Sequence, residues 1–482
     1  MFKARIFAII YMNAEKPHGT TKALKGALNM PDFDKMTLEQ LVRAEGYDCD
    51  CGKHHVSPME YLKIGRGVIV YVPEMIAAMH RKKPFVVCDK NTYAVAGKRV
   101  CEILAAANVP YSLYVIPGDR IAPSEWECGS AIMHYDPSCD MLLGVGSGVI
   151  NDTCKVLAHA IGVPSAIVGT APSMDGYASN SSSMEVNHVK VSLYNHAPVG
   201  ILLDSEILAQ APMRMLWAGL GDMVAKYIAI CEWRISNIVT GEYYCEHIAQ
   251  LMRTAVKKIV DASDGITKRD PDAIQSIAEG LIIAGVGMAY AEISRPASGL
   301  EHYFSHMWEM MALERGKPYD LHGIQVGIGT VLSMKLYKYI REIKPDRAVA
   351  EAHMKAFNRA DWEAQIRRIF GKTANEIIAI EDKCHKNDPQ KHAKRLDNIL
   401  NHWDEILKII DEELPDYDHL YNLMAATGMP MKPSDIGVPM QDVVDAFIGS
   451  RDIRDKYLSC SLLWDLGLTD EFAKILEKVA EA

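Results

Sequence analysis

Three histidines and one aspartate in the second half of the chain could together hold a divalent metal. Asp222 lies in AGLGDMVAKY, His302 and His306 lie in SGLEHYFSHMW, and His322 lies in DLHGIQVGIGT. His302 and His306 are four residues apart, so one face of a helix presents both imidazoles to the same space. One carboxylate with two imidazoles suits Zn²⁺, Ni²⁺ or Fe²⁺, and an open coordination position is typical of a catalytic metal.

Each of these residues also has an ordinary structural interpretation. Any of the histidines could be a hydrogen-bonded residue of a packed helix, and Asp222 could pair with Lys226, four residues on, as a helix salt bridge. The pattern is not the HExxH motif of zinc proteases, because Tyr303 follows His302 where that motif has Glu. The metal hypothesis therefore depends on all four residues occurring together.

A glycine-rich turn in the first half has the composition of a phosphate-binding loop. In MLLGVGSGVINDTCKVLAHAIG an apolar run precedes Gly144, Gly146 and Gly148, and an amphipathic helix is expected to begin near Asn151. Glycines let backbone N–H groups approach a phosphate, and a helix N-terminus adds partial positive charge. The spacing is GxGxG and not the GxGxxG of the Rossmann fingerprint. A dinucleotide loop and a merely tight strand-to-helix turn both fit it.

A second candidate for dinucleotide binding is Asp89, in PFVVCDKNTYAVAG. The predicted strand stops at this residue, where an acidic side chain could accept a hydrogen bond from a ribose hydroxyl. The alternative is that Asp89 only caps the helix that follows.

Two kinds of secondary structure must position these residues. Between about Pro84 and Asp204 short β-rich runs (PFVVCD, YSLYVIP, MLLGVG, PSAIVG) alternate with helical patterns, which predicts βαβ units and a parallel sheet. After Asp204 apolar residues recur at three- and four-residue spacing, which predicts helices only. We predict an N-terminal extension at residues 1–55, an α/β dinucleotide-binding domain at 56–205 and an all-helical metal and substrate domain at 206–482.

Composition excludes several classes of protein. The formal net charge of −10 disfavours broad binding to nucleic acid or to an anionic membrane, because both need a concentrated positive field. Eleven cysteines without disulfide-framework spacing indicate a reducing compartment. The first residues lack the cleavage site of a signal peptide, and the apolar stretch 280–290 is shorter than the roughly 20 residues of a membrane span. We expect a cytoplasmic protein.

Six segments resemble, in order, the signature segments of sn-glycerol-1-phosphate dehydrogenases. These segments are VCDKNTYAVAG, GVGSGVINDTCK, VGTAPSMDGYAS, AGLGDMVAKY, SRPASGLEHYFSH and LHGIQVGIG. The similarity runs from about Cys49 to Gly467, and PSMDGYAS is its most specific part. The superfamily also contains iron-type alcohol dehydrogenases, glycerol dehydrogenase and 3-dehydroquinate synthase. The resemblance implies a Rossmann-like nucleotide-binding α/β domain, an all-α metal-binding domain, and an active site between them.

The resemblance also implies roles for individual residues. Asp222, His302 and His322 would be the metal ligands, so that His306 faces substrate or relays a proton and is not a ligand. Asp175, together with His306, would contact substrate and serve catalysis, and Asp222 would also lie beside the substrate. The dinucleotide, NAD or NADP, would contact Gly148, Val149, Ile150, Asn151, Asp152, Thr170, Ala171, Pro172, Ser173 and Ser179. The turn and the strand end discussed above add Gly146 and Asp89 to these candidates.

The reaction that the resemblance implies is hydride transfer between a nicotinamide and the carbonyl of dihydroxyacetone phosphate, giving sn-glycerol 1-phosphate, in a homo-oligomer with one divalent metal per chain. Arg295 and Lys226 are candidates for holding the phosphate, or could form structural salt bridges only. Alternatives are a glycerol or polyol dehydrogenase, a dehydroquinate-synthase-like carbocycle-forming enzyme, and a catalytically inactive nucleotide-binding regulator.

Two further features are less clear from the sequence. The GVGSG turn replaces the more usual GGG-like turn of the family, so the choice between NAD and NADP stays open. Cys49, Cys51 and His54 in CDCGKHH are similar to a small metal knuckle, but only two thiols are present where a closed zinc site has four ligands. We expect a β-turn of small residues here.

Overall fold

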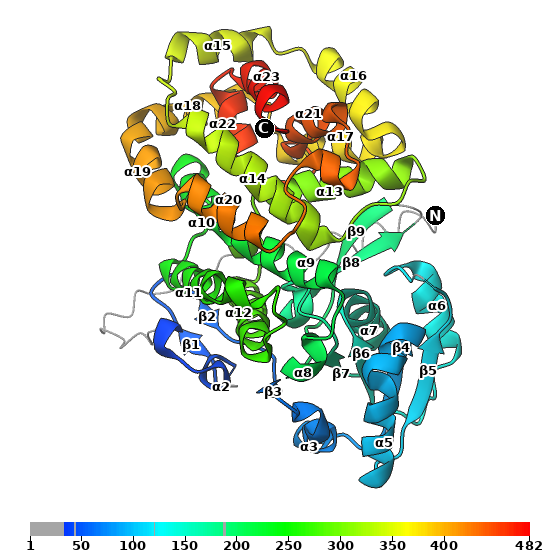
Figure 1. Ribbon diagram of the computed structural model, residues 1–482. Coiled ribbons are helices and arrows are strands. Elements are labelled where there is room, and N and C mark those ends of the chain that lie inside the picture. The colour runs from blue at the N-terminus through cyan, green and yellow to red at the C-terminus, as the bar shows by residue number, and fades with distance from the viewer. Residues whose placement is uncertain (1–32, 43–44, 120, 187–188) are drawn as a thin grey trace.

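The computed structural model describes residues 33–42, 45–119, 121–186 and 189–482 (Figure 1). The expected absence of a signal peptide falls on residues before Phe33 and lies outside the described residues, as does most of the predicted N-terminal extension. The described chain has one part built around a parallel sheet and one part built of helices, as predicted.

A six-stranded parallel sheet organises the first part of the chain. All four strands predicted from the apolar runs are present, and two more, β3 and β10, extend the sheet on one side. In spatial order the strands are β3 (Tyr61–Gly65), β10 (Gly200–Asp204), β7 (Ser165–Gly169), β6 (Met141–Gly146), β4 (Pro84–Asp89) and β5 (Ser112–Ile116).

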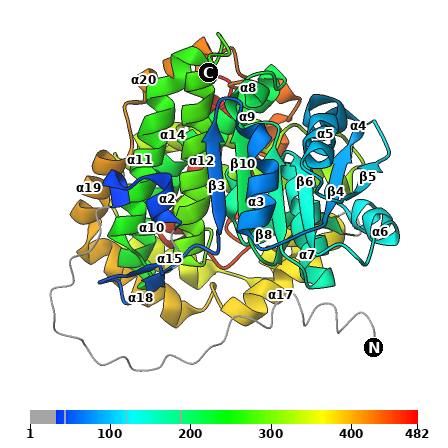
Figure 2. The same cartoon turned by 90° about the horizontal axis from the view of Figure 1, so that it is seen from below.

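Both faces of this sheet are buried, because successive side chains of a strand point to opposite faces. In β4, Phe85 and Val87 pack in the core cluster that includes α7, whereas Val86 and Cys88 pack in the cluster that includes α3 and α5. Figure 2 shows α3 in front of the sheet. The helices of this part are α3 (Val72–Ala78), α4 (Lys90–Thr92), α5 (Lys98–Ala106), α6 (Glu125–Met133) and α7 (Gly148–Ile161).

Two small hairpins lie outside the main sheet. The first, β1 (Tyr47–Asp48) with β2 (His54–His55), follows the short helix α2 (Leu38–Leu41) and packs on the helical part, not on the sheet. The second, β8 (Ser181–Val186) with β9 (Val189–Tyr194), reaches from the sheet part to the helical part and contacts α13. The sequence did not predict either hairpin.

Every described helix or strand after β10 is a helix, in agreement with the spacing of apolar residues. The core cluster of Phe85 and Val87 continues into α9, α11 and α12, so the two parts share one apolar core, and the exact domain limits stay a prediction. The helices are α8 (Ser205–Leu208), α9 (Met213–Val224), α10 (Lys226–Thr240), α11 (Glu246–Ala262), α12 (Pro271–Ala291), α13 (Leu300–Glu314), α14 (His322–Ile340), α15 (Arg347–Ala356), α16 (Arg359–Phe370), α17 (Ala374–Cys384), α18 (Pro389–Asn401), α19 (Trp403–Glu413), α20 (Tyr417–Ala426), α21 (Met440–Ser450), α22 (Ser459–Asp465) and α23 (Thr469–Val479).

Helix α12 contains the apolar stretch noted in the sequence. With 21 residues it is long and apolar enough to cross a membrane by length and composition, and 72% of its most apolar window is buried inside the protein. It packs along α11 and against α8 and α9. These contacts are those of a core helix.

Candidate active site

Asp222, His302 and His322 come together where three helices of the second part meet. Asp222 lies near the end of α9, His302 in the first turn of α13 and His322 at the first residue of α14. One ligand atom from each lies within 4.8 Å of the others. Asp222 and His302 are buried, whereas a third of the His322 side chain is exposed. A small ion bound here would be held by the buried Asp222 and His302, and substrate could reach it on the partly exposed His322 side.

Neighbouring carboxylates fix the orientation of both imidazoles. His302 Nδ1 donates to Glu301 Oε1 at 2.8 Å, and His322 Nδ1 lies 3.2 Å from Glu309 Oε1 and 2.9 Å from the hydroxyl of Ser305. Such partners hold the tautomer that leaves Nε2 bare for a metal. Glu301 and Glu309 were not predicted, although Glu301 is next to His302 in an apolar segment, which is a local signal.

The contact between Asp222 and His302 fits a bound cation. Asp222 Oδ1 lies 3.2 Å from His302 Nε2. With Nδ1 donating to Glu301, both of these atoms are acceptors, so only a proton or a metal ion between them makes the contact favourable. Burial lowers the pKa of His302, but its hydrogen bonds to Asp222 and Glu301 outweigh burial and raise that pKa overall. Without a metal the pair therefore captures a proton.

Asp175, which belongs to the sheet part of the protein, lies beside Asp222. It follows β7 in PSMDG, and its backbone N–H donates to Asp222 Oδ2 at 2.8 Å. Lys226, fully buried on α10, lies 2.6 Å from Asp175 Oδ2 and 3.5 Å from Asp222 Oδ1. The simple Asp222–Lys226 helix pair considered from the sequence is thus present as part of a larger group. Burial and the Asp222 charge raise the pKa of Asp175.

The charge of this group favours a divalent cation. Buried charges must be compensated, and the lysines offset only half of the carboxylates here. Burial opposes ionisation of Asp222, yet Lys226 and His302 hold its pKa well below the usual range. The carboxylates are Asp175, Asp222, Glu301 and Glu309, and the lysines are Lys226 and Lys190, the latter 3.4 Å from Glu309 Oε2.

His306 lies beside the three candidate ligands. Its ring stacks on His322 with centroids 5.3 Å apart, and it is 6.4 Å from His302. Burial, with the positive charge of Arg454, lowers the pKa of His306 well below its ordinary value, so its imidazole is neutral near pH 7. Its buried Nδ1 has no hydrogen-bond partner among the described residues. This nitrogen is free for a substrate or a water.

The glycine turn is a strand-to-helix turn of the expected kind. β6 ends at Gly146 and α7 begins at Gly148, three residues before the start predicted near Asn151, because Val149 and Ile150 already adopt helical conformation. A Cβ on Gly146 would lie 2.4 Å from Ile150 Cγ1, so only glycine lets the turn fold back on α7. The first N–H groups of α7 therefore point into the turn, as phosphate binding requires.

The other residues predicted to contact the dinucleotide lie around this turn. Thr170, Ala171, Pro172 and Ser173 follow β7 directly, and Thr170 N–H donates to Gly146 O at 3.0 Å. Asn151 donates to Gly176 O and Ser179 donates to the same carbonyl, at 3.2 and 3.0 Å. Asp152 pairs with Lys155 at 2.8 Å and accepts from Ser183 N–H. Their contacts with a dinucleotide stay a prediction.

Asp89 acts as a helix cap. The strand β4 ends at Asp89 as expected, and Asp89 Oδ1 accepts from the N–H groups of Asn91 and Thr92 at 2.7 and 2.9 Å. The alternative considered from the sequence, a helix N-cap, is therefore present. A ribose contact through the second carboxylate oxygen stays a prediction.

Of the two roles considered for Arg295, the structure contains the structural salt bridge. Its side chain is fully buried and pairs with Glu242 at 3.0 Å, and it also donates to the carbonyl of Tyr457. Lys226 is equally buried but lies in the site. Two basic residues that the sequence did not suggest, Lys190 on β9 and Arg454 before α22, act electrostatically on His306. They belong to segments far apart in the chain, so no motif marks them.

The expected β-turn at Cys49 and Cys51 is present between β1 and β2, but the expectation that it lacks ligands is wrong. The third thiol comes from Cys245, almost two hundred residues away, and the imidazole is that of His55 and not His54. His54 points outward and pairs with Asp48 at 2.8 Å. Successive residues of a strand face opposite ways, which explains the error of one residue.

Comparison with known proteins places this arrangement in a class. The sequence profile of iron-containing alcohol dehydrogenases matches residues 63–212. Among solved structures, glycerol dehydrogenase from Schizosaccharomyces pombe is similar with a TM-score of 0.56 and 15% identity, over 88% of this chain and 92% of that one. A probable glycerol dehydrogenase from Sinorhizobium meliloti has a TM-score of 0.57 over 87% and 98% of the two chains, at 16% identity. The fold is that of the iron-type dehydrogenases.

Sequence relatives define the family within this class. A glycerol-1-phosphate dehydrogenase [NAD(P)+] of Bacillus licheniformis is 31% identical over 344 residues, which is 70% of this chain and 86% of that protein. Another of the same name, from Methanosphaerula palustris, is 32% identical over 64% of this chain and 79% of that protein. The chain belongs to the glycerol-1-phosphate dehydrogenase family.

Proposed function

We propose that the protein is a metal-dependent, NAD(P)-linked dehydrogenase that interconverts dihydroxyacetone phosphate and sn-glycerol 1-phosphate. One observation carries this proposal: Asp222, His302 and His322 converge beside Asp175, which the loop after β7 brings from the sheet part. The membership of the family supports the substrate and the cofactor. We also propose that the enzyme is cytoplasmic and homo-oligomeric.

The metal ligands in this proposal are Asp222, His302 and His322, with Zn²⁺, Ni²⁺ or Fe²⁺ as the ion. The three donors leave a position open for substrate, and Glu301 and Glu309 hold the imidazoles in place. When bound, the metal supplies Lewis-acid polarisation of the substrate carbonyl, and the nicotinamide supplies the hydride.

Residues of this chain position the substrate and move the proton. Asp175 accepts a hydrogen bond from a substrate hydroxyl, and Lys226 holds the Asp175 carboxylate in place at 2.6 Å. His306 is neutral, so one ring nitrogen can give a proton to the substrate oxygen, directly or through a water, while the other takes one up. Gly146 and Gly148 let the dinucleotide phosphates approach the start of α7.

Arg454 and Lys190 are the proposed contacts of the substrate phosphate, because both lie close enough for their positive charges to lower the pKa of His306. Arg454→Gln should raise KM for dihydroxyacetone phosphate by about tenfold to a hundredfold, since a hydrogen bond to a charged group contributes roughly 1.5–3 kcal/mol. The same variant should leave kcat/KM for unphosphorylated dihydroxyacetone unchanged. Steady-state kinetics with both substrates test this, with Arg347→Gln, a half-exposed arginine on α15, as the control. An equal loss for both substrates would refute the phosphate role.

Glu301→Gln tests the orientation of His302. The amide keeps the size of the side chain but removes the charge that holds His302 Nδ1–H, so we expect the metal Kd to rise by about 10- to 100-fold. The activity of the variant should return to the wild-type level at saturating metal. Titration of metal-depleted protein, followed by activity and by calorimetry, measures both effects. A variant with unchanged affinity would show that Glu301 does not act on the ligand.

The experiment that tests the reaction itself is an absorbance assay of reduced nicotinamide. Enzyme, metal and NADH or NADPH are mixed with dihydroxyacetone phosphate, dihydroxyacetone or other ketones. The proposal expects rapid net oxidation of NAD(P)H with the phosphorylated substrate and much slower oxidation with the others. A preference for dihydroxyacetone would favour a polyol dehydrogenase. Absence of net oxidation would favour a carbocycle-forming enzyme or an inactive regulator.

A further inference from the structure

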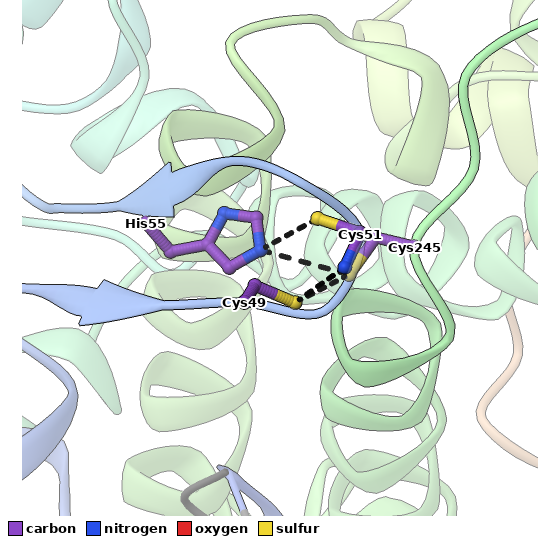
Figure 3. A group of neighbouring side chains, drawn as sticks. All are labelled: Cys49, Cys51, His55 and Cys245. Carbon is purple, nitrogen blue, oxygen red and sulfur yellow. Dashed lines mark hydrogen bonds between the residues drawn. The ribbon is translucent and has the colours of Figure 1, made fainter. Parts of the chain in front are cut away.

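A cluster of sulfur and nitrogen atoms lies in the helical part, apart from the Asp222 group. Figure 3 shows Cys49 and Cys51 on the turn between β1 and β2, His55 on β2, and Cys245 reaching in from the start of α11. Cys49, His55 and Cys245 are buried, and Cys51 is partly exposed. All four offer a ligand atom, and these atoms lie within 4.8 Å of one another.

The spacing of these atoms is that of a tetrahedral metal site. Cys49 Sγ and Cys245 Sγ are 3.7 Å apart, and His55 Nε2 lies 3.4 Å from Cys51 Sγ and 3.6 Å from Cys245 Sγ. With Zn–S near 2.3 Å and Zn–N near 2.0–2.1 Å, a regular tetrahedron has edges of about 3.8 Å between sulfurs and about 3.6 Å between sulfur and nitrogen. These three distances match the edges of such a tetrahedron, and all four atoms lie within 4.8 Å of one another.

The imidazole is already oriented as a ligand. His55 Nδ1 donates to the carbonyl of Tyr290 at 3.0 Å, so its proton is on Nδ1 and the lone pair of Nε2 faces the sulfurs. The ring is completely buried and stacks on Tyr290 with centroids 5.5 Å apart. Burial lowers the pKa of His55, which keeps the ring neutral as metal binding requires. Within the described part of the chain, the hydrogen-bond partners of Nε2 are the thiols of Cys51 and Cys245, which are weak donors.

Without a metal, burial raises the pKa of Cys49 and of Cys245, but several nearby groups would stabilise thiolates once a cation is bound. The N–H of Cys51 points to Cys49 Sγ at 3.5 Å, and the hydroxyl of Tyr243 lies 3.3 Å from Cys51 Sγ. Cys245 is the residue before α11, whose N-terminus has partial positive charge that stabilises an anionic sulfur. Lys53 lies over the Tyr243 ring at 4.3 Å and adds positive charge nearby. Gly52 has a φ of 87°, which closes the turn that points both thiols inward.

We propose that Cys49, Cys51, His55 and Cys245 bind a structural Zn²⁺ that fastens the N-terminal hairpin to α11 and α12. Three thiolates and one imidazole fill all four positions, so this site is closed and takes no part in the dehydrogenase chemistry. Each strand of the hairpin has two residues, and a metal would add a second attachment to the packing of Tyr47 in the apolar core. The proposal does not depend on the proposed reaction.

The test counts and identifies the metal in full-length protein. Protein purified with a reductant is dialysed against EDTA, which removes the ion of the open Asp222 site, and its metal content is measured by mass spectrometry. We expect about one tightly held Zn²⁺ per chain. Cys245→Ser should lose this ion, and Cys101→Ser, which replaces a buried cysteine of α5 outside the cluster, should keep it. Retention of zinc in both variants, or the absence of zinc from the wild type, would overturn the proposal.

X-ray absorption at the zinc edge of the EDTA-treated wild type gives an answer even if Cys245→Ser does not fold. The proposal expects three sulfurs at about 2.3 Å and one nitrogen at about 2.0–2.1 Å. Oxygen and nitrogen neighbours alone would assign the ion to another site and overturn it. Mass spectrometry of alkylated protein adds a third outcome: a disulfide between Cys49 and Cys245 in protein kept reduced would also contradict the site.

Discussion

His322→Ala is expected to lose the metal of the Asp222 site and nearly all activity together. The bound metal should fall at least about tenfold, and kcat/KM for dihydroxyacetone phosphate should fall at least about a thousandfold, equivalent to roughly 4 kcal/mol of transition-state stabilisation. The fold should survive, because His322 is the first residue of α14 and a third of its side chain is exposed. Metal analysis and steady-state kinetics on the same preparation measure both quantities.

Three companion variants make this result specific. His306, Glu309 and His322 could also hold a metal ion together. It must therefore be tested whether His302 or His306 is the imidazole ligand that acts with His322. His306→Ala should keep the metal and lose proton transfer, with kcat reduced about 100- to 10,000-fold. His402→Ala, an exposed histidine before α19, should change neither quantity. Metal loss in His306→Ala with retention in His302→Ala would reverse the assignment.

Gly148→Ala is expected to weaken dinucleotide binding without harming the fold. The added Cβ would lie 3.4 Å from Met174 Cγ, an ordinary contact, and alanine in place of glycine stabilises a helix by roughly 0.5–1 kcal/mol. The same methyl group fills the space through which a phosphate approaches the N–H groups of α7. We expect the Kd for NADH to rise by about tenfold to a hundredfold, which calorimetric titration measures, while the melting temperature stays equal or rises.

The matched control is Gly129→Ala in α6, where an added Cβ meets no atom within 4 Å. It should show the gain in melting temperature without the change in Kd. If Gly148→Ala binds NADH as tightly as the wild type, the turn after β6 does not hold the dinucleotide phosphates.

The sequence was sufficient to predict the elements that position the site. The runs PFVVCD and MLLGVG are buried on both faces, so they read as continuous apolar strands of a parallel sheet. Asp222, His302 and His322 could be singled out because charged and polar residues are rarely buried in apolar helices unless they have a partner. The β8–β9 hairpin was missed, since SSSMEV lacks the apolar character of the buried strands.

Partners that meet only in three dimensions could not be predicted. Cys245 lies in YYCEHI, where a single cysteine before a helix has no signal that connects it to Cys49 and Cys51. Lys190 and Arg454 lie on a hairpin and a loop far apart in the chain, and only the fold brings their charges to His306. Glu301 could have been predicted from the sequence, because a carboxylate often accepts the hydrogen bond from the second ring nitrogen of a histidine ligand.

The stereochemistry of the product is the most direct test of the proposed reaction. Metal-loaded enzyme reduces dihydroxyacetone phosphate with NADH, and the product is treated with a dehydrogenase specific for sn-glycerol 3-phosphate. We expect NADH to be consumed in proportion to substrate, and the product to resist this second enzyme because it is sn-glycerol 1-phosphate. EDTA should abolish the reaction until divalent metal is restored. A product that the second enzyme oxidises, or full activity after the Asp222 site has been emptied, would contradict the proposal.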